Sequence, residues 1–333
     1  MPVRGTRVSE FTPQRPKFWC VDCVAGARRE LQDGCVDLIV TDPPYGIDGD
    51  TLHKHYNRKE RFVIDGYTEV SRKDYADFSR RWIREAARVL RPGGSLYVLS
   101  GYTNLLDVLA ALRESGLREV NHIVWKYNFG VWTETKYVSS HYHILYYEKP
   151  GGPRTFHQFS RFCSQERNDA GGSLLYQDLE DVWSIKREYK PGQTKNKNEL
   201  PRALLAKILQ YSSDPEDVVC DFFLGSFATA KVAKGMGRSA IGFEINRAAF
   251  KHQERQVEKI EVGSMLPSLR EGRDDTPRKK GEPWSRELLD DLAARFRAHR
   301  RAGCNKKKAM EFLQEEFERG RFSILKALER RGL

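Results

Sequence analysis

Residues 36–46 read VDLIVTDPPYG, an apolar run followed by a polar, proline-rich turn. The apolar run predicts a buried parallel strand, so Asp42 falls at the carboxyl end of that strand, the edge at which open α/β sheets bind ligands. Pro43 and Pro44 lack backbone donors and hold the chain extended, which leaves their carbonyls free. A carboxylate, a free carbonyl and the ring of Tyr45 can together accept hydrogen bonds from an exocyclic amine and stack on the ring that carries it. The stretch therefore predicts a site for a nucleobase amine.

A second motif lies about 180 residues further along the chain and reads VVCDFFLGSFATA at 218–230. An apolar strand leads to Asp221, a Gly/Ser turn and a short helix follow, and a second strand ends at Glu244. This order predicts a β-α-β unit in which an acidic residue about 20 positions past the turn can hold a ribose diol. Gly225 stands where close backbone approach to a ligand matters most.

The two motifs resemble those of the amino-group DNA methyltransferases, which transfer a methyl group from S-adenosyl-L-methionine to adenine N6 or cytosine N4. The tetrapeptide Asp42-Pro43-Pro44-Tyr45 looks like the catalytic motif of this family, which implies that these four residues are catalytic. The stretch that begins at Asp221 is similar to the cofactor loop. The cofactor contacts that the resemblance implies are Asp22, Lys197, Asn198, Asp221, Phe223, Gly225, Ser226 and Glu244.

The order of the motifs matches the circularly permuted β group of this family, because the catalytic motif precedes the cofactor loop. The resemblance therefore implies an α/β fold with a Rossmann-like methyltransferase sheet in which both halves meet. Residues 18–262 are the predicted methyltransferase domain, after an N-terminal arm at 1–17. Asp22 closes a strand predicted at 18–21 and precedes a helix at 24–31, a place similar to that of the acidic residue near the cofactor adenine in this family.

Two parts of the chain depart from the family pattern. The usual cofactor loop is Asp-Pro-Phe-x-Gly-Ser-Gly-Thr, but here Phe222 replaces the proline and Phe227 replaces the second glycine. The geometry of the turn is therefore expected to differ. Leu200-Pro201 stands where the family has Lys-Pro. Lys197 and Asn198 precede this dipeptide, and the resemblance implies that they contact the methionine end of the cofactor.

The chain has 333 residues, a formal net charge of +11 and a sequence pI near 9.3. This length suffices for one large α/β domain and a small appendage, and the positive charge favours a polyanionic partner. The sequence shows no signal peptide and no apolar span of about 18 residues, which predicts a cytoplasmic protein with reduced thiols. Cys20 and Cys23 form a C-x-x-C pair, but no second pair follows at zinc-finger spacing, so no metal site is predicted. The cysteines are Cys20, Cys23, Cys35, Cys163, Cys220 and Cys304.

The residues after the catalytic motif predict further elements of the sheet. Apolar residues recur at three- and four-residue steps after Lys73, which predicts an amphipathic helix that packs on the sheet. The sequence Arg91-Pro92-Gly93-Gly94 is expected to end this helix. The elements predicted next are a strand at 95–99, a helix at 104–115 and an antiparallel strand pair at 117–127 and 141–148.

Residues 149–196 break this alternation and contain glycine pairs, arginines and amide side chains without a regular period. In the β group the target-recognition segment lies between the catalytic half and the cofactor half, so the resemblance implies that role for this stretch. An ordinary surface insertion is the alternative. The side chains in it that can reach phosphates or base edges are Arg154, His157, Arg161, Gln165 and Arg167.

The end of the chain is rich in charge and departs from the resemblance, which covers residues 18 to about 260. Residues 263–284 are rich in Gly, Pro and charged side chains and predict a linker. Beyond it, 285–333 predicts a basic all-α appendage of three helices, at 285–301, 306–319 and 323–331. The tight turn between the last two helices suggests a helix-turn-helix-like DNA module. Its alternative is a packing or dimerisation appendage. Dimerisation through it would make the protein a homodimer.

The sequence thus predicts a site-specific methyltransferase that modifies adenine N6 in double-stranded DNA, as part of a restriction-modification system in a prokaryotic cytoplasm. Asp42 and the Pro43 carbonyl would accept both N–H bonds of the amine, so that its lone pair points at the methyl group of the cofactor. The base would be flipped out of the duplex and stack on Tyr45. Asp before Pro-Pro-Tyr favours adenine, because cytosine-N4 enzymes of this type more often carry Ser. The alternatives are cytosine-N4 methylation, RNA methylation and an inactive DNA-binding regulator.

Overall fold

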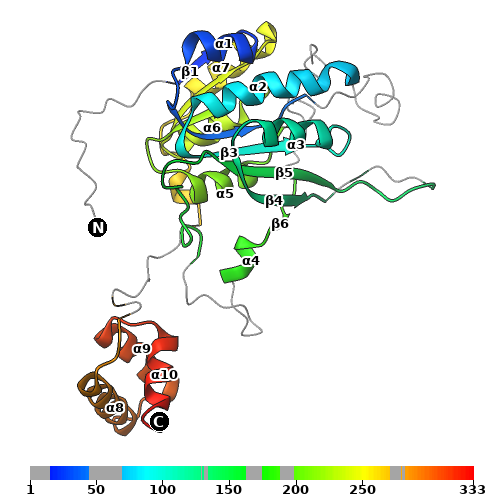
Figure 1. The fold of residues 1–333 in the computed structure, drawn as a ribbon. Coiled ribbons are helices and arrows are strands. Elements are labelled where there is room, and N and C mark those ends of the chain that lie inside the picture. Colours follow the sequence, from blue (N-terminus) through cyan, green and yellow to red (C-terminus); the bar gives the residue numbers. More distant parts are fainter. Residues whose placement is uncertain are drawn as a thin grey trace. The chain divides into compact units, whose positions relative to one another are not determined.

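The chain divides into two compact units (Figure 1). The larger unit comprises Met1–Arg161 and Tyr176–Glu271, and the smaller comprises Phe162–Leu175 and Gly272–Leu333. The computed structural model describes residues 16–44, 70–128, 130, 134–162, 175–187, 199–270, 279 and 282–333. Apart from residues 16 and 17, the predicted N-terminal arm at 1–17 lies outside these ranges.

Within the described residues, the larger unit contains one eight-stranded sheet with the order β1-β8-β7-β2-β3-β5-β4-β6. The strands β1, β8, β7, β2 and β3 run parallel, β5 runs antiparallel to β3 and β4, and β6 runs parallel to β4. This mixed α/β sheet confirms the predicted fold class and the predicted antiparallel pair. The strand bounds are β1 (Lys17–Trp19), β2 (Val36–Thr41), β3 (Leu90–Ser100), β4 (Arg118–Lys126), β5 (His141–Glu148), β6 (Val182–Ser184), β7 (Val218–Asp221) and β8 (Ser239–Phe243).

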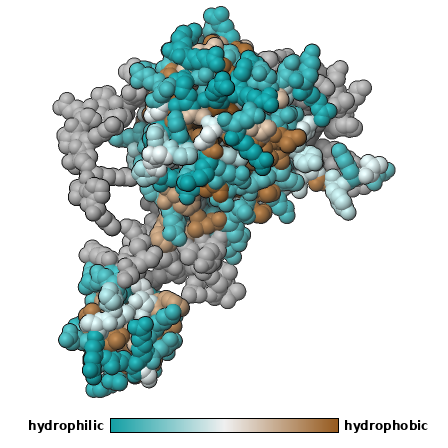
Figure 2. Space-filling view, in the orientation of Figure 1, coloured by the Kyte–Doolittle hydropathy of each residue, from teal (hydrophilic) through white to brown (hydrophobic). Residues whose placement is uncertain are grey.

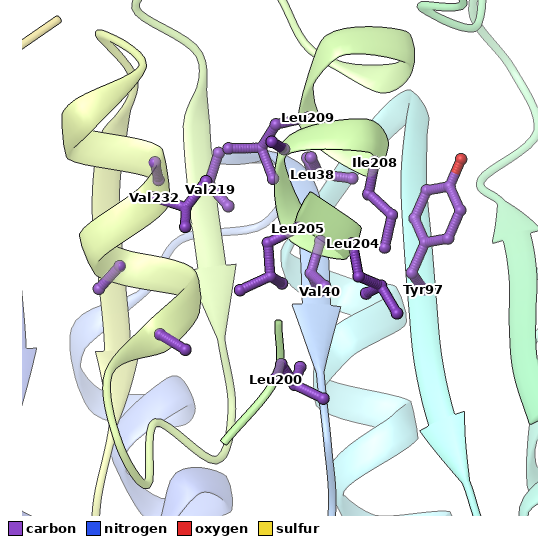
Figure 3. Packing of buried hydrophobic residues seen from close by; sticks show 14 of the residues in the cluster. Leu38, Val40, Tyr97, Leu200, Leu204, Leu205, Ile208, Leu209, Val219 and Val232 are labelled. Atoms are coloured by element: carbon purple, nitrogen blue, oxygen red, sulfur yellow. The ribbon is translucent and has the colours of Figure 1, made fainter. Parts of the chain in front are cut away.

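Helices cover both faces of this sheet. The side chains of the central strand β2 accordingly alternate between two apolar cores. Leu38 and Val40 join the core beneath α5, where Leu204 and Leu205 pack over them (Figure 3). Ile39 joins the core under α1, α2 and α3. The helix bounds are α1 (Cys23–Glu30), α2 (Tyr75–Val89), α3 (Leu105–Glu114), α4 (Leu175–Leu179), α5 (Arg202–Ser212), α6 (Ala228–Gly235) and α7 (Arg247–Glu258), with short 3-10 turns η3 (Arg72–Asp74) and η4 (Leu266–Ser268).

The strand after α2 begins earlier than predicted. Leu90 already pairs with Val36 of β2, and the next pair joins Ser95 to Leu38. The four residues between Leu90 and Ser95 therefore bulge away from β2, while Gly93 and Gly94 exchange backbone hydrogen bonds with Lys149, directly after β5. Gly93 allows this bulge, because its φ is 78° and a Cβ atom there would collide with the Pro153 carbonyl oxygen.

The larger unit also continues past residue 262, the predicted end of the methyltransferase domain. Met265 and Leu269 pack against the core under α5, and the Met265 backbone N–H donates to the Gly235 carbonyl at 2.8 Å. The stretch predicted as a linker thus begins as part of this unit, because two of its apolar side chains cover the end of α6.

The smaller unit contains α8 (Arg286–Arg301), α9 (Lys306–Phe317) and α10 (Arg321–Glu329), close to the three predicted helices. Its core is separate and is built by residues from all three helices, among them Leu292, Leu313 and Leu328. None of the helices in the described part of the chain combines the length and the apolar composition needed to cross a bilayer.

Candidate functional site

The two sequence motifs meet at the carboxyl edge of the sheet. Strands β2 and β7 are parallel neighbours, with Ile39 opposite Cys220. At their ends the Thr41 hydroxyl donates to Asp221 Oδ1 over 2.8 Å, and both residues are buried. This bond joins residues 180 positions apart in the chain. The expectation that both halves meet in one sheet is therefore confirmed.

The Asp42-Pro43-Pro44 turn is held from α2. The Tyr75 hydroxyl, on a side chain that is 2% exposed, donates to the Pro44 carbonyl over 2.7 Å. The prediction that both proline carbonyls are free is thus wrong for Pro44, because α2 places a donor against it. Of the two, the Pro43 carbonyl is the acceptor that can serve a ligand. Tyr45 lies outside the described residues.

Aromatic side chains from the antiparallel end of the sheet lie close to Asp42. Trp125 on β4, Tyr127 just after it and Tyr142 on β5 surround the Arg187 guanidinium, which lies 5.2 to 5.4 Å from the centre of each ring. Burial raises the pKa of Tyr142 to about 12, the positive charge of Arg187 opposes this rise, and the negative charge of Asp42 adds to it. The effect of Asp42 on this pKa means that Tyr142 lies within electrostatic range of the predicted catalytic carboxylate.

The sequence analysis did not predict this aromatic wall, which consists of Trp125, Tyr127, Tyr142 and Arg187. Its residues come from three separate segments, and two of those segments were predicted only as strands. The available signal was positional, since β5 runs antiparallel to β3 and the start of β5 must lie at the same edge as the end of β3.

The turn after β7 is organised by two carboxylates. The Phe223 backbone N–H donates to Asp221 Oδ1 over 3.0 Å. Glu244 follows β8, and its two carboxylate oxygens accept from the backbone N–H groups of Gly225, over 2.8 Å, and Asn246, over 2.7 Å. The predicted residues Asp221, Gly225 and Glu244 are therefore brought together at one edge.

Burial dominates the electrostatics of these two carboxylates. Burial, with a smaller contribution from the nearby Glu244 charge, raises the pKa of Asp221 to about 6, against the hydrogen bonds from Phe223, Thr229 and Thr41. Burial also raises the pKa of Glu244, against its backbone hydrogen bonds. A pair of partly desolvated carboxylates at a strand edge is typical of a binding site rather than of a purely structural turn.

The two departures from the family loop are both accommodated by packing. Phe222 is 1% exposed and packs against Trp82 and Phe243. Phe227 is fully buried between Phe18 and Phe250, with ring centroids 5.0 and 5.7 Å away. It adopts the left-handed conformation, with φ 57° and ψ 26°, that a glycine takes without strain. This conformation suits a glycine as well as the phenylalanine found here, and packing accommodates the ring.

The remaining predicted cofactor residues occupy mixed environments. The ring of Phe223 points toward α2, where it packs against Phe78 and Trp82, so it offers the site chiefly its backbone. Ser226 is 7% exposed, and its carbonyl accepts from Lys231 Nζ. Lys197 and Asn198 lie outside the described residues.

Asp22 lies at the same edge but already has a structural role. Its Oδ1 accepts from the backbone N–H groups of Val24 and Ala25, which caps the start of α1. Strand β1 is the neighbour of β8, and the Glu244 N–H donates to the Trp19 carbonyl, so Asp22 and Glu244 follow adjacent strands. Among the described residues, no three His, Cys, Asp or Glu side chains are arranged to hold a metal ion.

The structure gives internal partners to three of the side chains predicted to reach DNA from 149–196. Arg161 donates to Asp178 on α4 and to Gln210 on α5, both over 2.8 Å. His157 pairs with Asp214, and Arg154 pairs with Glu148. These pairs fix the segment to the unit, and the role in target recognition stays a prediction.

The same stretch is also more regular than predicted. It contributes α4 and the edge strand β6 to the larger unit, and Trp183 of β6 is buried in the core under α5. Gln165 and Arg167 lie outside the described residues.

Residues 36–255 match the family N6_N4_Mtase, whose description is DNA methylase. The chain belongs to this family of DNA methylases. The type II methyltransferase M.BamHI of Bacillus amyloliquefaciens is 33% identical over 246 residues, which cover 69% of this chain and 54% of that protein. The chain thus spans about half the length of that relative. The matched residues include both motifs and exclude the three C-terminal helices.

Two solved structures share the fold of this DNA methylase. One is described as a DNA modification methylase from Thermus thermophilus complexed with S-adenosyl-L-methionine, with TM-score 0.53, 21% identity, and coverage of 73% of this chain and 93% of that one. The other is the PvuII DNA methyltransferase, cytosine-N4-specific, with TM-score 0.54, 15% identity, and coverage of 75% and 92%. At these identities the likeness establishes the fold alone.

Proposed function

We propose that this DNA methylase transfers a methyl group from S-adenosyl-L-methionine to the exocyclic amine of a flipped base in duplex DNA. The observation that carries this proposal is the Thr41–Asp221 hydrogen bond, which brings the turn containing Asp42 next to the turn containing Gly225. Family membership and the Thermus relative's bound S-adenosyl-L-methionine support the choice of cofactor. The relative M.BamHI supports a type II role in restriction-modification.

The residues after β7 and β8 fit this cofactor. Glu244 offers carboxylate oxygens at a strand end, where they could accept from a ribose diol. Gly225 has no side chain, so the backbone of the turn leaves room for close approach. Asp221 can accept from an ammonium group, and its buried carboxylate would be stabilised by that charge. When bound, the cofactor supplies an electrophilic methyl group on a sulfonium.

The target amine would bind between Asp42 and the aromatic wall. The Asp42 carboxylate and the Pro43 carbonyl can accept its two N–H bonds, which turns the nitrogen lone pair toward the methyl group. Tyr75 holds the Pro44 carbonyl and so fixes the turn that carries both acceptors. Tyr142, together with Tyr45, can stack on the base once it has left the duplex.

The chemistry needs positioning more than activation of a protein nucleophile. In-line attack forms the N–C bond while the S–C bond breaks, with no covalent enzyme intermediate. The product amine is then cationic and releases its proton, a step for which a carboxylate is a sufficient base. Catalysis therefore comes from orientation and from the charge of Asp42.

Adenine N6 is the proposed target, because Asp rather than Ser precedes Pro-Pro-Tyr. Cytosine N4 is the second candidate, since the PvuII methyltransferase with the same fold is cytosine-N4-specific. An inactive regulator is a weaker interpretation, because packing accommodates both Phe222 and Phe227, and Phe227 adopts a left-handed conformation that is also open to glycine.

The role of Asp42 can be tested with Asp42→Ala. We expect methyl transfer to duplex DNA to fall by at least about a thousandfold, because one donor or acceptor lost at the reacting atom costs about 10²–10³ and Asp42 also carries the charge. Binding of S-adenosyl-L-methionine, measured by calorimetry, should change less than a few fold. Loss of cofactor binding with the same variant would contradict this assignment.

A further inference from the structure

The C-terminal unit, residues 282–333, has features that the methyl-transfer site does not explain. It lies outside the family match at 36–255 and has its own apolar core, in which α8, α9 and α10 all take part. Trp284 closes one side of this core, packing on Phe317 and donating from its indole N–H to the Ser323 hydroxyl over 3.0 Å. A separate, fully packed unit of this kind can carry a function of its own.

The last two helices have the spacing of a helix-turn-helix. Helix α9 ends at Phe317, three residues form the turn, and α10 begins at Arg321. Glu318 makes the turn in the left-handed conformation, with φ 51°. Arg319 is 3% exposed, lies 4.3 Å from the ring centre of Trp284 and donates to the Pro283 carbonyl. The charge of Arg319 therefore holds the turn in place and is not offered to a partner.

The outer face of α10 has a composition unusual for a solvated surface. Ile324, Ala327 and Leu328 point into the core, which leaves Arg321, Phe322, Lys326, Glu329 and Arg330 exposed. Phe322 is 69% exposed, and Lys326 lies 4.8 Å from its ring centre. The face thus carries an exposed aromatic ring, three cations and one carboxylate, Glu329, a composition that fits the groove of a nucleic acid, where an apolar group meets base edges and cations meet phosphates.

A second basic surface surrounds the turn between α8 and α9. Between Leu292 and Met310 the chain carries no Asp or Glu. Two nearby side chains, Arg295 and His299, already have an internal partner, since both pair with Glu316. The exposed cations at the turn are Arg297, Arg300, Arg301, Lys306, Lys307 and Lys308. In Figure 2 the visible face of this unit is largely hydrophilic, with smaller apolar areas.

We infer that the C-terminal unit binds duplex DNA, with the outer face of α10 in a groove and the cations of the α8–α9 turn on the phosphates. The helix-turn-helix spacing favours a duplex over a single strand, because a recognition helix fits the major groove. The choice of DNA over RNA rests on the proposed function. The unit would give the enzyme a DNA contact separate from the methyl-transfer site.

The test uses the full chain and compares two lysine pairs of equal charge. Lys306→Gln with Lys307→Gln removes two cations of the turn, and the control, Lys251→Gln with Lys259→Gln, removes two exposed cations from α7 and the residue that follows it. Binding to a mixed-sequence DNA duplex of about 30 base pairs is measured by fluorescence anisotropy at several salt concentrations. We expect the slope of log affinity against log salt to become shallower by about 1.8 for the turn pair, at about 0.9 for each lost phosphate contact. The control should change the slope by less than half as much.

Phe322→Ala tests the face of α10 without changing charge. We expect about a tenfold loss of duplex affinity with an unchanged salt slope, and an unchanged unfolding temperature because the ring is exposed. The inference would be overturned if both lysine pairs gave the same slope of log affinity against log salt. Wild-type affinity of Phe322→Ala for the DNA duplex would also overturn it. The choice of DNA as partner would be overturned if the wild-type protein bound an RNA duplex as tightly as DNA and the same variants lost the same affinity for it.

The methylation assay separates this inference from the proposed function. If the wild-type protein methylates DNA, but the turn pair and its control show the same salt dependence of duplex affinity, only the inference about the C-terminal unit is refuted. If the wild-type protein transfers no methyl group, but both C-terminal variants bind the duplex more weakly than it does, only the proposed function is refuted.

Discussion

Replacement of Asp221 by asparagine should stabilise the fold at neutral pH and damage cofactor binding. The carboxylate is 5% exposed, and burial raises its pKa from 3.8 to about 6. At about 1.4 kcal/mol for each pKa unit, the ionised carboxylate destabilises the folded state by about 3 kcal/mol at pH 8. The asparagine of the Asp221→Asn variant would still accept the bonds from Thr41 and Phe223 through its amide oxygen, without the charge.

The direction of the pH dependence follows from the proton balance. The folded carboxyl of Asp221 keeps its proton up to about pH 6, whereas the unfolded one releases it near 3.8. Folding therefore takes up a proton between these values, so stability falls as the pH rises from about 4 to 6 and stays lower above. Asp221→Asn should be more stable than wild type by about 3 kcal/mol at pH 8, and by less than about 1 kcal/mol at pH 4.

Urea unfolding of both proteins at pH 4 and pH 8 measures this difference. Asp217, whose pKa is also raised to about 6 mainly by burial, titrates in both proteins and cancels in the comparison. Binding of S-adenosyl-L-methionine should weaken at least about tenfold in the variant, because a charged acceptor is lost. The same difference in stability between variant and wild type at both pH values would refute the argument that the buried charge is costly.

Three further substitutions test the rest of the site. Tyr75→Phe removes the donor to the Pro44 carbonyl and should lower kcat about tenfold with little change in KM for the cofactor; an unchanged kcat in steady-state assays would contradict the positioning role. Tyr142→Ala should lower DNA-dependent turnover about tenfold, while Tyr142→Phe should retain most of it, since base stacking on an aromatic ring contributes about 1–3 kcal/mol. Equal turnover in the wild type and both variants would exclude stacking on Tyr142. Phe227→Gly relieves left-handed strain of about 1–2 kcal/mol but removes a fully buried ring that contributes about 3–5 kcal/mol, so the unfolding temperature should fall by several degrees, and wild-type stability would show that the ring contributes little.

The parts of the fold that sequence predicted well are those with local signals. The apolar run before Asp42 predicted β2, because a strand buried on both faces needs such a run. The three- and four-residue steps after Lys73 predicted α2, whose bounds are Tyr75–Val89. Asp221, Gly225 and Glu244 were placed together, because a β-α-β unit brings the ends of adjacent parallel strands to one edge.

What the sequence did not reveal depends on contacts between distant segments. The Tyr75 bond to Pro44 and the aromatic wall around Arg187 arise only when α2, β4 and β5 pack around β2. The basic residues of 149–196 were predicted to reach DNA, because the sequence does not show which partners they have in the fold. Arg161 in fact pairs with Asp178, 17 positions away, and with Gln210, 49 positions away.

The most direct test of the account is to incubate the protein with labelled S-adenosyl-L-methionine and mixed-sequence duplex DNA, digest the DNA to nucleosides and identify the methylated base by mass. We predict N6-methyladenine in the wild-type reaction and none with Asp42→Ala. N4-methylcytosine would contradict the proposed target while preserving the mechanism. Bound cofactor with no methylated DNA would contradict the central claim.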